Sequence, residues 1–163
     1  MTPFHVVKLA GDAVDELRRQ EWNAHGRSHT KTGKWVKGTR WALLKAPDRQ
    51  SLDQLGTLGE VFHANKRLYR AFLLYTQLRL LYDLDDRALA PAHLDAWLAW
   101  ASRSKLAPFV KLARTLRARR DGILAAIRLG LSKGRVRSRD ARRRAVPSGA
   151  GVGRAVARGG VFL

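Results

Sequence analysis

The chain contains no cysteine among its 163 residues. This absence excludes disulfide bonds, thiolate catalysis and cysteine-based zinc sites. Long apolar runs are also missing, because none approaches the ~18 residues that a membrane-spanning helix needs. The start does not read as a signal peptide, since Pro3, His5 and Lys8 interrupt any apolar stretch there. The sequence therefore predicts a cytoplasmic protein with one domain and no membrane contact.

Several motifs of known chemistry are absent as well. The sequence has no nucleophile elbow, no phosphate-cradling glycine loop and no dinucleotide-binding fingerprint. His25 and His29 have a spacing that could bind a metal on a helix, but Gly26 argues against a helix between them. The acidic segment 83–86 is more typical of turn and cap residues than of a cation site. Neither a catalytic residue nor a metal ligand is predicted from these patterns.

Acidic residues are scarce relative to basic ones. The chain has 32 lysines and arginines against 13 aspartates and glutamates, which gives a net charge of +19 and an isoelectric point near 11.6. Residues 1–121 hold 22 of these bases and 12 of these acids, so the excess is not confined to the C-terminal part. Such a charge is favoured when a polyanion neutralises it, and the sequence therefore predicts DNA or RNA as the partner.

Apolar residues recur at helical spacing, which predicts a mainly α fold. We expect helices over about 6–21 and 51–82, a third that begins at Pro91 with an apolar face through Ala101, and a fourth that begins near Pro108 with an apolar face through Ile127. Ser51 and Gln54 fit a capping box at the start of the second helix, and Gly130 fits a C-cap after the last. The periodicity ends at about residue 136. Residues 137–163 are mostly Arg, Gly, Ala and Val, and we predict a disordered basic tail there.

The segment WNAHGRSHTKTGKWVKGTRWALLK, residues 22–45, combines bases with tryptophans. Its glycines and hydroxyl residues predict a basic loop that turns helical near Thr39. Basic residues recur every three positions here, a spacing that suits contact with a phosphate backbone. Exposed tryptophans can stack on nucleobases. Alternatively, the tryptophans pack on the helices. The predicted nucleic-acid-binding residues are Arg27, Lys31, Lys34, Trp35, Lys37, Arg40, Trp41, Lys45, Lys111, Arg114 and Arg117.

Four stretches resemble one family of insertion-sequence transposases. They are PFHVVKLAGDAVDELRR (3–19), TKTGKWVKGTRWALLKAPDRQ (30–50), ANKRLYRAFLL (64–74) and WLAWASRSKLAPFVKLARTLRARRDGILAAIRLGLSKGRV (97–136). The resemblance is to the C-terminal part of the ISL3 family, whose catalytic domain is of the DDE type. It covers roughly residues 2–136, in order and without large gaps.

The resemblance implies a nuclease and strand transferase with an RNase H-like core. In that family three carboxylates hold two Mg²⁺ ions for phosphoryl displacement. The first carboxylate lies well upstream of the matching stretches. The second directly precedes PFHVV, and the third, a glutamate on the final core helix, directly follows Val136. Those positions hold Thr2 and Arg137 here, and neither side chain supplies an anionic oxygen to a divalent cation. We therefore expect no catalytic residue and no cofactor in this chain, Mg²⁺ being implied only for the intact family.

The same resemblance implies how the chain is organised. Residues 1–136 would be a partial DDE domain, with a helical insertion over about 40–105, followed by the tail. We expect a truncation or misassigned start before residue 1 and a frameshift near codon 136. Because the central sheet of the core would then be missing, the apolar faces of the first and last helices should lack partners, giving a loosely packed helical protein.

Two functions follow from these expectations. One is a catalytically dead transposase fragment that keeps affinity for DNA and lies at the nucleoid. The other is a non-catalytic basic helical DNA-binding protein or transposition regulator. Under either function, the partners of the chain would be DNA and either full-length transposase or a second copy of this chain. A third, less favoured interpretation is an unrelated RNA- or ribosome-associated module.

Overall fold

Residues 1–130 are described in the computed structural model, and within them the chain is helical with no strand. The elements in order are α1 (Pro3–Ala24), η1 (Arg27–His29), α2 (Lys31–Gly38), α3 (Arg40–Leu44), η2 (Pro47–Arg49), α4 (Leu52–Ala64), α5 (Lys66–Leu80), η3 (Arg87–Leu89), α6 (Ala90–Arg103), α7 (Ala107–Ala118) and α8 (Arg120–Arg128). The predicted mainly α fold is confirmed. Residue 137 and the predicted tail lie outside the described residues.

The long helix α1 packs against α2, α3, α5 and α7. Thr2 caps it, because its hydroxyl accepts a hydrogen bond from the backbone N–H of His5, and Pro3 occupies the first turn. These two residues start the helix three positions earlier than the apolar periodicity predicted. Its buried positions include Val6, Ala10 and Leu17.

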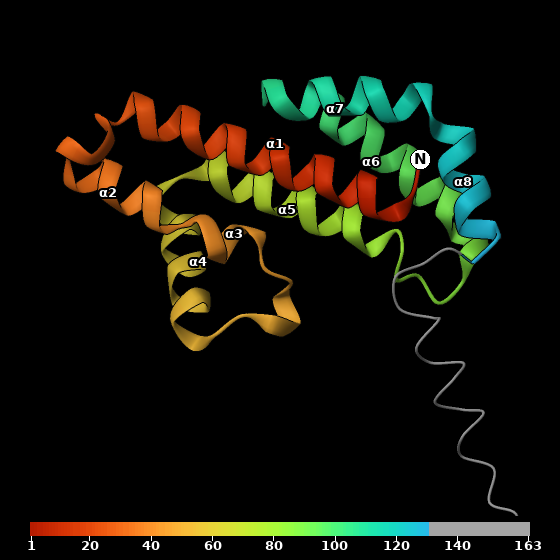
Figure 1. The fold of residues 1–163 in the computed structure, drawn as a ribbon, viewed down its shortest axis with the longest axis horizontal. Helices are drawn as coiled ribbons and strands as arrows, with labels where there is room; N and C mark the ends of the chain where they lie inside the picture. The colour runs from red at the N-terminus through yellow and green to blue at the C-terminus, as the bar shows by residue number, and fades with distance from the viewer. Residues whose placement is uncertain (131–163) are drawn as a thin grey trace, which may run out of the picture.

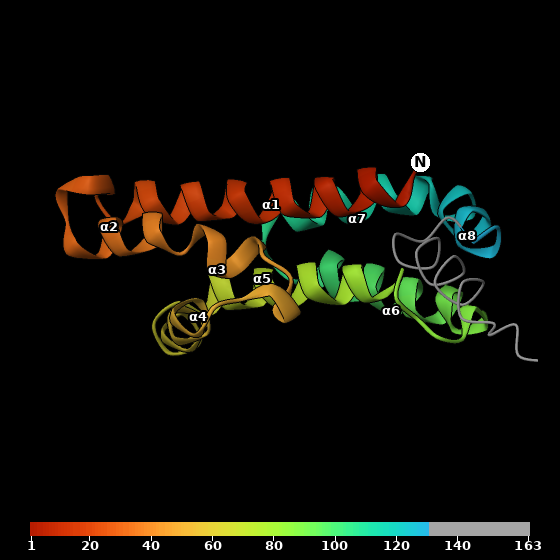
Figure 2. The ribbon, with the colours of Figure 1, turned by 60° about the horizontal axis from the view of Figure 1, so that its bottom comes forward.

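The long helices form two layers. Figure 2 shows α1 and α7 in one layer and α5 and α6 in the other. Helix α1 packs on both α5 and α7, and α6 packs on α7. Figure 1 shows α2 at one end of α1 and α8 at the other.

The apolar faces predicted to lack partners are in fact covered by helices of this chain. Leu17 of α1, Phe109 and Leu116 of α7 and Ile123 of α8 are fully buried in one hydrophobic cluster. The expectation that these faces lack partners was therefore wrong for residues 1–130. It assumed that these faces could pack only on a sheet, whereas α5 and α6 supply equivalent apolar surfaces.

The helix predicted over 51–82 is two helices, separated at Asn65. The capping box at its start is confirmed, since Ser51 Oγ and Gln54 Oε1 exchange bonds of 3.3 and 3.1 Å with each other's backbone N–H. Asn65 has an extended backbone, ends α4 and caps α5 by accepting from the N–H of Leu68 at 3.0 Å. An asparagine side chain competes with helical hydrogen bonds in this way.

The last predicted helix is also two helices. Its backbone breaks at Arg119, which ends α7 and precedes α8. The predicted C-cap is confirmed, because Gly130 has φ +79°, a conformation that glycine adopts without strain. The predicted start near Pro91 is confirmed as well, since this proline lies in the first turn of α6. No helix of the described residues is both long and apolar enough to cross a bilayer.

The prediction of a loop across residues 31–38 was wrong, because this stretch forms α2. Thr30 caps the helix by accepting from the N–H of Gly33 at 2.9 Å. Gly33 is buried against the preceding turn, and a Cβ there would lie only 1.5 Å from the carbonyl oxygen of Arg27. The glycine was counted as a helix breaker, yet it is the residue that allows this close packing. The predicted turn to helix near Thr39 is confirmed by α3.

Candidate nucleic-acid interface

The basic segment folds as a helical hairpin in which α2 returns along the end of α1. Two consecutive residues with positive φ, Gly26 at +78° and Arg27 at +55°, make the reversal. The hydroxyl of Thr30 donates to the carbonyl of His25, and Arg27 Nε donates to Asn23 Oδ1 at 2.9 Å. These bonds fix the reversal and so set the direction of α2.

Three lysines share the solvent face of α2. Lys31, Lys34 and Lys37 are exposed, whereas Gly33 and Val36 on the opposite face are buried. Successive lysines three residues apart are separated by about 4.5 Å along the helix axis. None of the three forms an ion pair with a described residue. Their charges are therefore available to an external anion.

Arg40 lies in a different electrostatic environment. Its Nε is 3.7 Å from Asp15 Oδ1, and the same carboxylate accepts bonds from Arg18 at 2.8 Å and from Arg19 at 2.6 Å. Burial tends to raise the pKa of Asp15, but the hydrogen bonds from Arg19 and Arg18 outweigh it and hold this pKa below its usual value. Asp15 thus stays ionised and offsets part of the positive charge of Arg40.

The two predicted tryptophans differ in accessibility. Trp35 is half-buried, and its indole N–H donates to Glu60 Oε2 at 2.9 Å. Trp41 is 57% exposed, with the guanidinium of Arg40 5.0 Å from its ring centroid. Trp41 therefore offers a ring for stacking, while Trp35 mainly attaches α2 to α4. Lys45 follows α3 directly and is exposed.

The basic residues of α7 that the sequence predicted to bind nucleic acid do not lie beside the lysines of α2. Lys111 lines a shallow groove between α1 and α7 together with Asp12 and Glu16, so an anion is less favoured there. Arg117 donates to Ser102 Oγ at 3.1 Å, and Arg114 is exposed. Figure 1 shows α7 away from α2, beside the N-terminal part of α1. The role of all eleven residues in binding stays a prediction.

The sequence analysis did not single out two basic residues of α5. Lys66 and Arg70 lie beside aromatic side chains from α4 and α6, in a groove of about 500 Å³. Their spacing of four residues on one helix face was the available signal. The aromatic partner from α6 is distant in sequence, so no local pattern indicated the groove.

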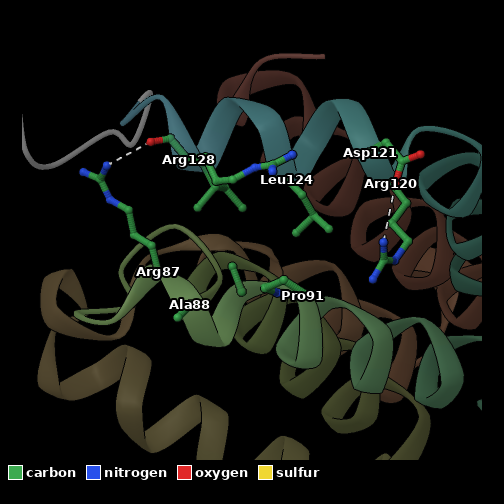
Figure 3. A pocket seen from close by; sticks show the side chains of 9 residues that line it. Arg87, Ala88, Pro91, Arg120, Asp121, Leu124 and Arg128 are labelled. Carbon is green, nitrogen blue, oxygen red and sulfur yellow. Dashed lines mark hydrogen bonds and ion pairs between the residues drawn. The ribbon is translucent and has the colours of Figure 1, made fainter.

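A second cavity, of about 460 Å³, lies between the start of α6 and α8 (Figure 3). Two of its three arginines, Arg87 and Arg120, already have protein partners. Arg120 binds both oxygens of Asp95 at 2.6 and 2.7 Å, and Arg87 donates to the carbonyl of Arg128 at 3.3 Å. The bond from Arg120 holds the pKa of Asp95 below its usual value. These contacts stabilise the packing of α8 on α6, and the cavity is a weaker candidate for an anion.

The residues present do not fit the Mg²⁺ site that the resemblance implies. Thr2 offers a neutral hydroxyl, which caps α1 and lies 2.7 Å from His5 Nδ1. No group of three His, Asp or Glu side chains in residues 1–130 could hold a metal ion. Arg137, at the other expected position, lies outside the described residues. We therefore derive no chemistry through a metal in this chain.

Comparison with known proteins gives a consistent result. The family model of DDE-type ISL3 transposases, described as a transposase, matches residues 1–146. The matched range continues past residue 136, so it gives no support to a break in register at that point. No solved structure matches the chain.

Two kinds of curated transposase are similar to it. The transposase for insertion sequence element IS1557 of Mycobacterium tuberculosis is 35% identical over 156 residues, covering 83% of this chain and 35% of that protein. The transposase for insertion sequence element IS1001 of Bordetella parapertussis is 29% identical over 126 residues, covering 77% and 31%. The chain spans about a third of the length of these relatives.

Proposed function

The chain belongs to the ISL3 family of insertion-sequence transposases, and from this premise we propose that it acts in transposition by binding DNA without cleaving it. One observation carries the proposal: the exposed lysine face of α2, in which Lys31, Lys34 and Lys37 point to solvent with no acidic partner among residues 1–130. Lysines placed in this way neutralise phosphates without reading base edges. We expect duplex binding with little sequence preference.

The non-catalytic part of the proposal depends on donor chemistry. A two-metal nuclease needs carboxylate oxygens to hold and bridge its cations. Thr2 supplies only a hydroxyl at the position where the family resemblance calls for a carboxylate, and this hydroxyl is engaged in capping α1. Replacing Thr2 with aspartate would keep the cap, because aspartate is an equally good N-cap residue. It would therefore restore the donor without unfolding the helix.

Salt dependence of DNA affinity tests the lysine face directly. The change is the triple variant Lys31→Ala, Lys34→Ala, Lys37→Ala, with affinity for a labelled duplex measured by fluorescence anisotropy across a range of NaCl concentrations. The logarithm of the affinity should fall less steeply with the logarithm of salt, by about 0.9 for each phosphate that the variant no longer neutralises. The overall affinity should fall as well.

A matched control removes the same charge at the other end of the molecule. Lys8→Ala, Arg119→Ala and Arg128→Ala together also remove three positive charges, from the N-terminal part of α1, the junction of α7 with α8 and the end of α8. Figure 1 shows α8 and the N-terminus at the end of the molecule opposite α2. This control should change the slope little. An unchanged slope in the α2 variant would show that these lysines neutralise no phosphate, and an equal change in both variants would assign DNA affinity to general charge. Either outcome would contradict the proposal.

Further parts of the proposal concern organisation and partners. We propose that residues of about 40–105 correspond to the helical insertion of a DDE domain, although α5 packs directly on α1 and shares its core. A chain that occupies element DNA without cleaving it would compete with full-length transposase and so regulate transposition. Its place in the cell would then be the nucleoid.

A further inference from the structure

A groove of about 500 Å³ separates the end of α4, the start of α5 and the end of α6. Aromatic rings come to it from all three helices: Phe62 from α4, Tyr69 from α5 and Trp100 from α6. Phe62 is 50% exposed, and its ring meets that of Tyr69 edge to face with centroids 4.8 Å apart. This contact fixes the orientation of both rings at the groove.

Trp100 differs from the neighbouring tryptophan in how its polar edge is used. The indole N–H of Trp97 is buried and donates to the carbonyl of Leu74 at 2.8 Å. Trp100 is only half-buried, and its N–H makes no hydrogen bond within residues 1–130 and is not among the buried atoms that lack a partner there. Trp100 thus lines the groove, and its indole N–H is accessible and has no partner among the described residues.

The edge of the groove is basic. His63, Lys66 and Arg70 line it, and no acidic residue among those described does so. A 3.0 Å bond from Nη1 to the carbonyl of Ser104 holds the guanidinium of Arg70 in place. Lys66 is exposed and forms no ion pair with a described residue. The charge at this edge is therefore complementary to phosphate.

We propose that this groove binds an unpaired nucleotide of DNA, with the base against Trp100 and the flanking phosphates at Lys66 and Arg70. The inference rests on the proposed DNA-binding function and deepens it. An aromatic ring offers a face for stacking to any base, and basic side chains beside it neutralise the backbone. In a duplex the bases are stacked on each other, so only an unpaired or extruded base can reach such a ring.

The occupant is identified by combining the two kinds of side chain. A peptide or a second copy of the chain would use the apolar rings but would find three basic side chains and no acid at the edge. A duplex would use the charges but could not place a base on Trp100. Of these three occupants, unpaired nucleic acid is the one that uses both features of the groove.

The first experiment uses the unaltered chain. A duplex carries one bulged 2-aminopurine, and a second duplex carries the same base paired. We expect binding to quench the fluorescence of the bulged base, because stacking on the indole ring of Trp100 quenches 2-aminopurine, and to leave the paired base unchanged. Absence of quenching while both duplexes still bind would overturn the inference and leave the proposed function intact. If neither duplex binds, the proposed function fails with it.

The second experiment compares single-stranded and duplex affinity in variants. Trp100→Leu should weaken binding of a short thymidine oligonucleotide about tenfold, as expected for the removal of one stacking ring. Its affinity for a fully paired duplex should remain unchanged, which also shows that the variant is folded. Lys66→Ala should weaken binding of the oligonucleotide, whereas Arg128→Ala, which removes the same charge outside the groove, should not.

Other outcomes would contradict the inference. Equal loss of single-stranded and duplex affinity in Trp100→Leu would assign the residue a structural role. Unchanged single-stranded affinity together with a change in the mass of the particle in solution would make the groove a protein contact. Equal effects of Lys66→Ala and Arg128→Ala would show that only overall charge matters.

Discussion

At the scale of single residues, short side chains and glycines determine this fold more than charge does. Gly33 shows the principle most clearly, because its missing Cβ leaves room for the carbonyl oxygen of Arg27. The adjacent reversal needs positive φ at Gly26 and Arg27, and Thr30 closes it. The position of the three lysines of α2 thus depends on the packing of small residues that carry no charge.

Replacing Gly33 by alanine should destabilise the protein by about 1–3 kcal/mol, because a side chain in a filled site forces the backbone apart. The free energy of unfolding from urea titration, followed by circular dichroism, measures this loss. Gly59→Ala is the matched control, since nothing lies within 4 Å of a Cβ at that helical position. It should stabilise by about 0.5–1 kcal/mol through helix propensity. Equal effects of the two substitutions would show that Gly33 is not closely packed.

At the scale of elements, apolar periodicity predicted that helices form, but it did not predict where several of them begin and end. The apolar spacing in residues 6–21 and 94–101 predicted α1 and α6, because each buries one face on a neighbour. The breaks at Asn65 and Arg119 were missed, since the apolar spacing continues across both. Helix α2 was missed because propensity counts against glycine, whereas packing against the preceding turn favours it here.

The candidate site followed the same division. The three-residue spacing of the lysines could be recognised in the sequence and survives as one exposed face. The contacts of Arg40 with Asp15 and of Trp35 with Glu60 could not, because each joins residues 25 positions apart. The aromatic groove joins residues 62–70 to Trp100, so only the packing of α6 on α5 reveals it.

Asn65 is the element-scale test of how two helices are held at their junction. Its Oδ1 caps α5, and its Nδ2 donates at 2.9 Å to Glu21, which also accepts from Arg67 at 2.8 Å. Asn65→Ala should cost about 1–2 kcal/mol of stability by removing the cap, measured by urea unfolding. Asn65→Asp keeps the cap but places a second carboxylate beside Glu21. An unfolding free energy of Asn65→Ala equal to that of the native chain would show that the junction does not depend on this side chain.

At the scale of the whole molecule, one apolar core coexists with a large excess of positive charge. Buried residues of all the helices from α1 to α8 belong to a single cluster, so these helices should unfold together. The net charge of +19 acts against that core through self-repulsion. Acidic residues relieve it only locally, as Asp15 does for Arg18 and Arg19 and as Asp95 does for Arg120.

Salt should therefore have opposite effects on folding and on DNA binding. Raising NaCl screens the repulsion among lysine and arginine side chains that have no acidic partner, so the melting temperature of the free chain should rise. The same salt competes for phosphate and should weaken the complex with DNA. Thermal unfolding followed by far-ultraviolet circular dichroism and by tryptophan fluorescence measures the first effect, and the two signals should change at one temperature. The triple lysine variant of α2 should melt higher than the native chain at low salt and gain less from added salt. A melting temperature that falls with salt would show that attractive ion pairs, such as those of Asp15 and Asp95, outweigh the repulsion among the remaining lysines and arginines.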